Sequence, residues 1–80
     1  MARTRRAVFH SSLTKMGWAV IKGGQTVSRH RNQKDAEFAA TSAGRNMREN
    51  GGLGRVVLHK SDGTIREERT YRKAPERHPG

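Results

Sequence analysis

Seven basic side chains and no acidic one occupy the first 32 residues: Arg3, Arg5, Arg6, Lys15, Lys22, Arg29 and Arg31. The whole chain has 17 Lys and Arg against seven Asp and Glu, so +7 of its formal net charge of +10 lies in this first segment. Guanidinium and ammonium groups contact phosphate oxygens, and such contacts carry little sequence information. The sequence therefore predicts a small basic protein in which these seven residues contact a DNA or RNA backbone with little sequence specificity.

The remaining reactive side chains form no catalytic or metal-binding pattern. A hydrolytic triad needs a nucleophile, a base and an orienting acid that converge in a pocket, and no local signature places such a set here. The four histidines include no pair at the i, i+3 or i, i+4 spacing that would share a helix face. We expect a protein that is not an enzyme and has no cofactor, no metal and no small-molecule substrate.

The glycine-rich segment GGLGR at 51–55 lacks the lysine and hydroxyl of a phosphate-binding loop. It follows an expected helix instead of leading into one, so it is interpreted as a helix stop and strand lead-in. Cysteine is absent, which removes disulfides and thiolate metal sites and fits a cytoplasmic protein. No apolar run approaches the roughly 18 residues that span a bilayer, so we expect no membrane insertion.

The chain divides into three expected parts: a basic flexible arm at 1–16, a folded domain at 17–75 and a frayed tail at 76–80. Within the domain, WAVIK and TVSRH around Gly23-Gly24 predict a β-hairpin. GRVVLHK and TIREERTY around Ser61-Asp62-Gly63 predict a second hairpin. A helix at 33–50 lies between them. The ββαββ order predicts an α+β fold, with one helix packed on an antiparallel four-stranded sheet.

The predicted helix has two distinct faces. Its buried face is an apolar stripe at helical spacing: Ala36, Ala39, Ala40, Ala43 and Met47. Phe38 lies on the opposite face with Lys34, Thr41 and Arg45. A phenylalanine in that position has three candidate partners, namely Phe9 or Leu13 of the arm, a second subunit, or an outside ligand, unless it is simply exposed. Phe38, Lys34 and Arg45 are therefore candidate interaction residues.

An alternative function follows from the small expected core, the two open sheet edges and the outward Phe38. These features favour a protein-interaction module, either a homodimer or an inhibitor or adaptor that docks an acidic protein partner. The chain has only four Phe, Trp and Tyr residues, which argues against a single-strand binder built on stacked bases and favours contact with a duplex or with a structured RNA backbone. In the second hairpin, acids and bases alternate along the returning strand, which is typical of cross-strand pairing on a solvated scaffold.

Several of these pieces occur in an order that resembles a known family. They are Trp18-Ala19-Val20, Gly23-Gly24, the alanine-rich helix, Val57-Leu58-His59, Asp62-Gly63-Thr64-Ile65-Arg66 and Tyr71. Over about residues 17–75 the chain resembles the small bacterial family catalogued as domain of unknown function 2188. The resemblance implies a compact α+β domain and no particular activity.

Overall fold

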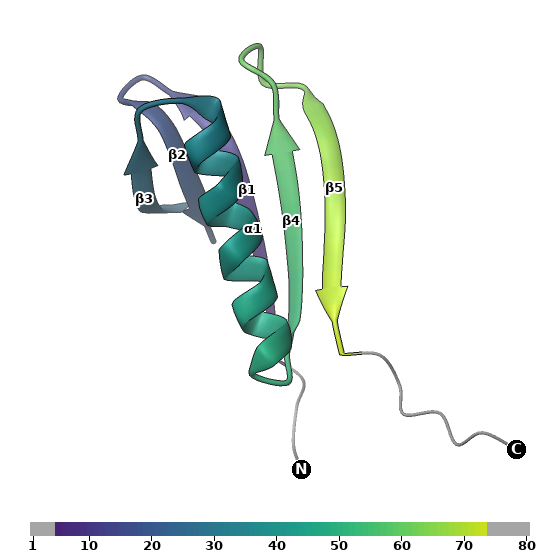
Figure 1. The fold of residues 1–80 in the computed structure, drawn as a ribbon. Helices are drawn as coiled ribbons and strands as arrows, with labels where there is room; N and C mark the ends of the chain where they lie inside the picture. Colours follow the sequence, from purple (N-terminus) through teal and green to yellow (C-terminus); the bar gives the residue numbers. More distant parts are fainter. Residues whose placement is uncertain (1–4, 74–80) are drawn as a thin grey trace, which may run out of the picture.

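Five strands and one helix follow one another as βββαββ in the computed structural model, which describes residues 5–73 (Figure 1). Their bounds are β1 Arg6–Thr14, β2 Gly17–Lys22, β3 Gln25–His30, α1 Gln33–Glu49, β4 Leu53–His59 and β5 Ile65–Arg72. The strands form one sheet in the order β3-β2-β1-β4-β5. Strand β1 runs antiparallel to β2 and parallel to β4, so the sheet is mixed.

Strand β1 lies at the centre of the sheet, where the sequence predicted a flexible arm. The predicted arm is therefore wrong for Arg6–Thr14, and so is the four-stranded antiparallel sheet. Ala7, Phe9 and Ser11 form its buried side, a weak apolar pattern that does not predict a strand. Backbone pairing on both edges, to β2 and to β4, holds this segment instead. Residues 1–4, with Arg3, and the predicted tail at 76–80 lie outside the described residues.

The two predicted hairpins and the helix are confirmed. Gly23 and Gly24 form the β2–β3 turn with φ of +58° and +78°, a conformation that glycine adopts without steric cost. The side chain of Asn32 caps α1 by accepting a hydrogen bond of 2.8 Å from the backbone N–H of Asp35. At the other end Gly51, with φ of +81°, follows the C-cap Asn50.

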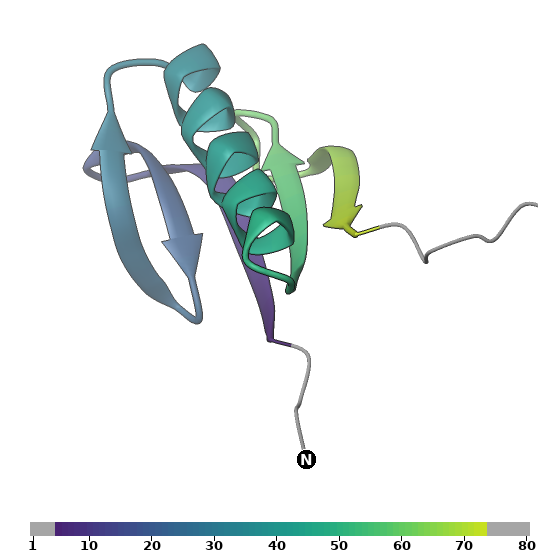
Figure 2. The same cartoon turned by 60° about the horizontal axis from the view of Figure 1, so that its bottom comes forward.

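Helix α1 covers one face of the sheet and packs mainly on β1 and β4 (Figures 1 and 2). The core cluster beneath it contains Ala7, Phe9, Val20, Ala40, Val56 and Leu58. Ala36, Ala40, Thr41 and Gly44 are the buried residues of the helix, whereas Ala39, Ala43 and Met47 are only partly buried. The face of the helix that contacts the sheet therefore includes Gly44. Glycine has no side chain, so a search for apolar side chains does not identify this position. At this point helix and sheet approach so closely that Gly44 faces Gly54 backbone to backbone.

No described element covers the opposite face of the sheet (Figure 2). The register places His10 of β1 beside Ile21 of β2 and Val57 of β4 on that face. Val57 is only 4% exposed. Val8 lies two residues before His10 in β1, on the same face, and remains 40% exposed. This uncovered face therefore combines apolar and polar side chains at the surface.

Candidate nucleic-acid interface

An open groove lies between α1 and the strands β4 and β5, and we refer to it as the Phe38 groove. It has a volume of about 280 Å³, and its lining residues are Lys34, Glu37, Phe38, Thr41, Ser42, Arg45, Leu58 and Arg69. Leu58 is 1% exposed and forms the floor, while the Phe38 ring is 74% exposed. The three predicted interaction residues, Phe38, Lys34 and Arg45, therefore meet in one place. Their role in binding stays a prediction.

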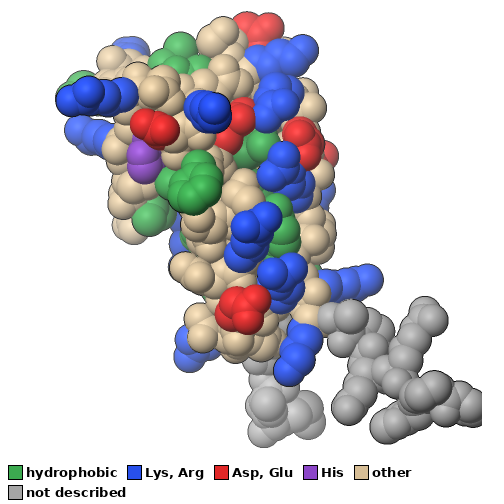
Figure 3. All heavy atoms as spheres, viewed as in Figure 1, with side chains coloured by type: hydrophobic (Ala, Val, Ile, Leu, Met, Phe, Trp, Pro, Cys, Tyr) green, Lys and Arg blue, Asp and Glu red, His purple; other side chains and the backbone are tan. Residues whose placement is uncertain are grey.

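Basic side chains from both walls continue along the line where α1 faces β5. We call this line the basic seam and define it by Lys34, Arg45 and Arg48 of α1 with Arg66 and Arg69 of β5. Seen from the helix side, Lys and Arg side chains gather in a column there, with Asp and Glu side chains between them (Figure 3). The guanidinium carbons of Arg45 and Arg48 lie 5.8 Å and 5.6 Å from the centre of the Tyr71 ring. That ring holds both cations at the surface of the seam.

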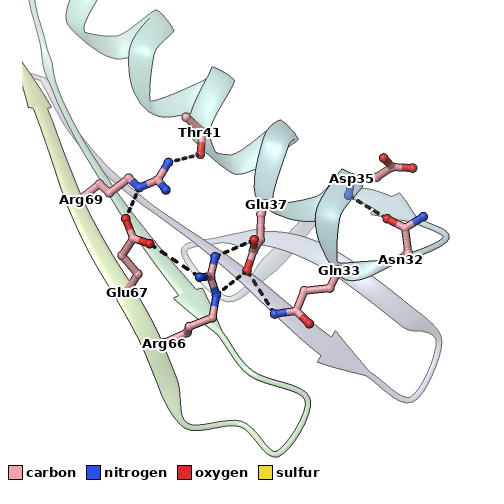
Figure 4. Close-up of polar contacts among 8 residues, drawn as sticks. All are labelled: Asn32, Gln33, Asp35, Glu37, Thr41, Arg66, Glu67 and Arg69. Atoms are coloured by element: carbon pink, nitrogen blue, oxygen red, sulfur yellow. Dashed lines mark hydrogen bonds and ion pairs between the residues drawn. The ribbon is translucent and has the colours of Figure 1, made fainter.

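Acidic side chains within the seam are paired with arginines (Figure 4). Arg66 donates two hydrogen bonds to Glu37, from Nε at 3.0 Å and from Nη2 at 2.7 Å. Glu67 accepts from Arg69 and also lies near Arg66, with 3.7 Å between Nη1 and Oε1. Arg69 in turn reaches Thr41 Oγ1 at 3.5 Å. The network fixes the wall of the groove and offsets its negative charge.

Charge pairing also shifts the protonation equilibria in this network. The hydrogen bond from Arg69, and then its charge and that of Arg66, hold the pKa of Glu67 below its ordinary value. The same hydrogen bond to Glu67, followed by one to Tyr71, raises the pKa of Arg69. Both groups therefore stay ionised across the neutral range, and the seam keeps its charge pattern there.

Across residues 5–73 the structure leaves a large excess of cations without a carboxylate partner. This part of the chain has fifteen Lys and Arg, of which only Arg48, Arg55, Arg66 and Arg69 form ion pairs. Those pairs use four of its six acidic side chains and leave Asp35 and Asp62. The described part therefore has eleven Lys and Arg side chains without an ion pair, compared with two acidic side chains without one. Such a surface has a strong positive potential.

The six described members of the predicted backbone-binding set do not share one face. Arg5 and Arg6 lie at the start of β1, whereas Lys15 follows its other end, roughly 30 Å away at about 3.3 Å per residue. Arg31 follows β3 at the same end as Lys15. Lys22 lies on the helix side, with Nζ 5.9 Å from the centre of the Phe9 ring, and Arg29 pairs with Ala19 on the uncovered face.

Sequence reasoning missed Arg69, which lines the groove, and Arg66, which binds the groove residue Glu37. Strict alternation along the returning strand places Arg66 and Glu67 on opposite sides of the sheet. The structure has a register shift between Leu58 and His59, which adds one residue to β5 at this point. The shift lets both neighbours reach the helix side, as Figure 4 shows. A bulge of this kind has no reliable signal in a single sequence.

Two histidines form a hydrogen-bonded pair on the uncovered face. His59 Nδ1 donates to the carbonyl oxygen of Gly63 at 3.0 Å, because a carbonyl oxygen only accepts. His59 Nε2 then accepts from His10 Nδ1 at 3.0 Å. Burial, followed by the neighbouring His59 and Arg55, lowers the pKa of His10. The pair supplies no third ligand: among residues 5–73 no group of three His, Cys, Asp or Glu is placed to hold a metal ion.

Comparisons with known proteins identify a family but no activity. A family model described as "Uncharacterized protein conserved in bacteria (DUF2188)" matches residues 9–71. The match begins within β1, eight residues before the resemblance expected from sequence, and so includes most of the central strand. No curated protein and no solved structure matches the chain. Over the part that the structure describes, no helix has the length and apolar character needed to cross a membrane.

Proposed function

The chain belongs to the family described as "Uncharacterized protein conserved in bacteria (DUF2188)", which names no activity. From charge and geometry, we propose that it binds the phosphate backbone of nucleic acid with little sequence specificity. One observation carries this proposal. Eleven Lys and Arg in residues 5–73 have no carboxylate partner, against two acids outside the ion pairs. Cations on several faces suit a long polyanion, which collects many weak phosphate contacts.

The shape of the molecule favours a polymer over a small metabolite. The Phe38 groove, at about 280 Å³, is slightly smaller than typical small-molecule pockets of about 300–1,000 Å³. It is also open to solvent, so it does not enclose a bound molecule. Arg5 and Arg6 at one end of β1 and Lys15 and Arg31 at the other lie far enough apart to contact separate phosphates.

Binding across a salt series tests the proposal. Affinities for labelled 20-base-pair duplex DNA, duplex RNA and single strands are measured by fluorescence anisotropy between about 50 and 300 mM KCl. For duplex DNA we expect the logarithm of the affinity to fall with the logarithm of salt at a slope of about −3 or steeper, the effect of several released counterions. A slope shallower than about −1, or equally tight binding of poly-glutamate, would overturn it.

Substitution of matched cations locates the contact surface. Arg5→Gln with Arg6→Gln removes two charges at one end of β1, and Lys34→Gln with Arg45→Gln removes two from the groove. Each pair reduces the salt slope by about 2 if those side chains contact phosphates. The arginines are substituted and not deleted, because Arg6 belongs to β1 and the carbonyl oxygen of Arg5 accepts a hydrogen bond of 2.7 Å from Leu53 N–H.

A homodimer is the second candidate function, and the uncovered sheet face favours it. Val8 is 40% exposed there, and the face holds Ile21 and the nearly buried Val57 beside it. Sedimentation velocity on the wild type and on Val8→Lys tests this candidate. A wild-type dimer that becomes a monomer on substitution supports it, whereas a wild-type monomer at about 100 µM contradicts it.

A further inference from the structure

Phe38 is the most exposed aromatic side chain of the protein, and it lies beside cations. Its ring is 74% exposed, whereas Phe9 is 6% exposed in the core and Trp18 and Tyr71 are partly buried. The groove next to the ring contains Lys34, Arg45 and Arg69. An aromatic face with cations around it is the arrangement on which proteins stack an unpaired base while they hold its backbone.

The helix spaces these groups along a line. Lys34 is one turn before Phe38, a rise of about 6 Å, and Arg45 is about 10.5 Å after it. Thr41 and Ser42 add hydroxyl groups between Phe38 and Arg45. Cations thus lie on both sides of the ring along the helix, where they can contact phosphates on either side of a stacked base.

The one carboxylate in the groove is already neutralised. Glu37 accepts both hydrogen bonds from Arg66 and a third, of 3.1 Å, from Gln33 Nε2. Its side chain is 18% exposed, so the arginine compensates most of its repulsion toward a phosphate. Lys34 and Arg45 have no carboxylate partner in the described part and remain available to an anion.

We propose that the Phe38 groove binds one unpaired nucleotide of a nucleic-acid strand. The base stacks on the Phe38 ring, Lys34 holds the phosphate on one side, and Arg45 holds the phosphate on the other. This inference rests on the proposed function and narrows its substrate class to strands with at least one unpaired base, because paired bases in a duplex present no free face to a ring.

Binding of two probes by the full chain tests the inference. The probes are a fluorescein-labelled 12-base oligothymidine and a 12-base-pair duplex at about 50 mM KCl. The variants are Phe38→Ala, Phe38→Trp and, as a matched control, Val27→Ala, which shortens a 57% exposed side chain on β3. Exposure of Phe38 means that its variants keep the fold, which circular dichroism and a thermal midpoint within about 2 °C of wild type verify.

Phe38→Ala is expected to weaken oligothymidine binding about 5- to 150-fold, the range of one base–aromatic stack. It leaves duplex binding within about 2-fold, and Phe38→Trp and Val27→Ala bind both probes as the wild type does. Unchanged oligothymidine binding by Phe38→Ala, or an equal loss on both probes, overturns the inference and leaves the proposed function standing. A wild type that binds neither probe removes both. A dimer that Phe38→Ala converts to a monomer also overturns the inference, because Phe38 then belongs to a subunit contact.

Discussion

Gly54→Ala tests the account of how helix and sheet meet. An ideal Cβ at Gly54 lies 2.4 Å from the carbonyl oxygen of Gly44 and 2.7 Å from its Cα, where ordinary contact begins at 3.4 Å. The neighbouring atoms are backbone, so no side-chain rotation relieves the overlap. Helix α1 must therefore move away from β4 by about 1 Å.

The expected loss is large for a domain of this size. Overpacking a close contact costs about 1–3 kcal/mol, and the rigid partner places Gly54→Ala near the upper end. Replacing glycine restricts the unfolded chain and returns about 0.5–1 kcal/mol. The net loss in the free energy of unfolding is about 2 kcal/mol, against a total of about 3–5 kcal/mol for such a core. The thermal midpoint should fall by about 8–16 °C.

Urea unfolding followed by the fluorescence of Trp18 measures this loss, and Gly44→Ala provides the comparison. A Cβ at Gly44 meets side-chain atoms, Val56 Cγ2 at 2.5 Å and Tyr71 Cδ2 at 3.0 Å, which can shift. Alanine also improves helix propensity by about 1 kcal/mol. Gly44→Ala should therefore cost less than Gly54→Ala. A Gly54→Ala protein within about 0.5 kcal/mol of wild type, or a larger loss for Gly44→Ala, would show that the backbone contact between Gly44 and Gly54 does not limit stability.

Three further predictions concern single side chains. Ser11→Ala should raise the free energy of unfolding by about 1 kcal/mol, since the Ser11 hydroxyl is fully buried and has no hydrogen-bond partner; a loss in urea unfolding contradicts this. His10 faces His59, Arg55 and Glu68, and its pKa in the folded protein is lowered from 6.5. As the pH falls below about 6.5, the unfolded chain therefore binds more protons than the folded protein, and the free energy of unfolding decreases. Urea titrations at pH 7 and 5 should show a smaller drop for His10→Gln, and equal drops refute the assignment. Glu37→Gln breaks the pair with Arg66, whose side chain is 40% exposed, and should cost under about 1 kcal/mol of stability. The same change should strengthen oligothymidine binding about 3-fold by removing one negative charge from the groove, and weaker binding in the anisotropy assay would show that the intact pair shapes the groove.

Local signals in the sequence account for most of the fold. Glycine pairs and Ser61-Asp62-Gly63 predicted the turns, and Asn32 with the alanine stripe predicted the helix, because caps and turns depend on neighbouring residues alone. Strand β1 escaped prediction for the opposite reason. Arg6 at its start and the arginines just before it indicate an arm, and Ser11 occupies a fully buried position. Its pairing with β4 depends on residues more than 40 positions away.

The candidate groove was half predicted. Helical spacing alone placed Lys34, Phe38 and Arg45 on one outward face, and all three line the groove. The other wall required knowledge of which strand lies beside the helix and of the bulge that turns Arg66 toward it. Alternating acids and bases in β5 carry the same local pattern whether they face solvent or a helix, so the contribution of Arg69 depended on tertiary structure.

The central position of β1 also sets the order in which the protein can fold. Strands β1, β2 and β3 are consecutive antiparallel neighbours, which pair after closing short loops. Pairing of β1 with β4 brings Phe9 beside Val56 and must first close a loop of nearly fifty residues. We expect this step to limit the folding rate, as non-local contacts generally do. In stopped-flow refolding, Val56→Ala should then slow folding more than Val27→Ala, and equal folding rates would show that β4 docks after the barrier.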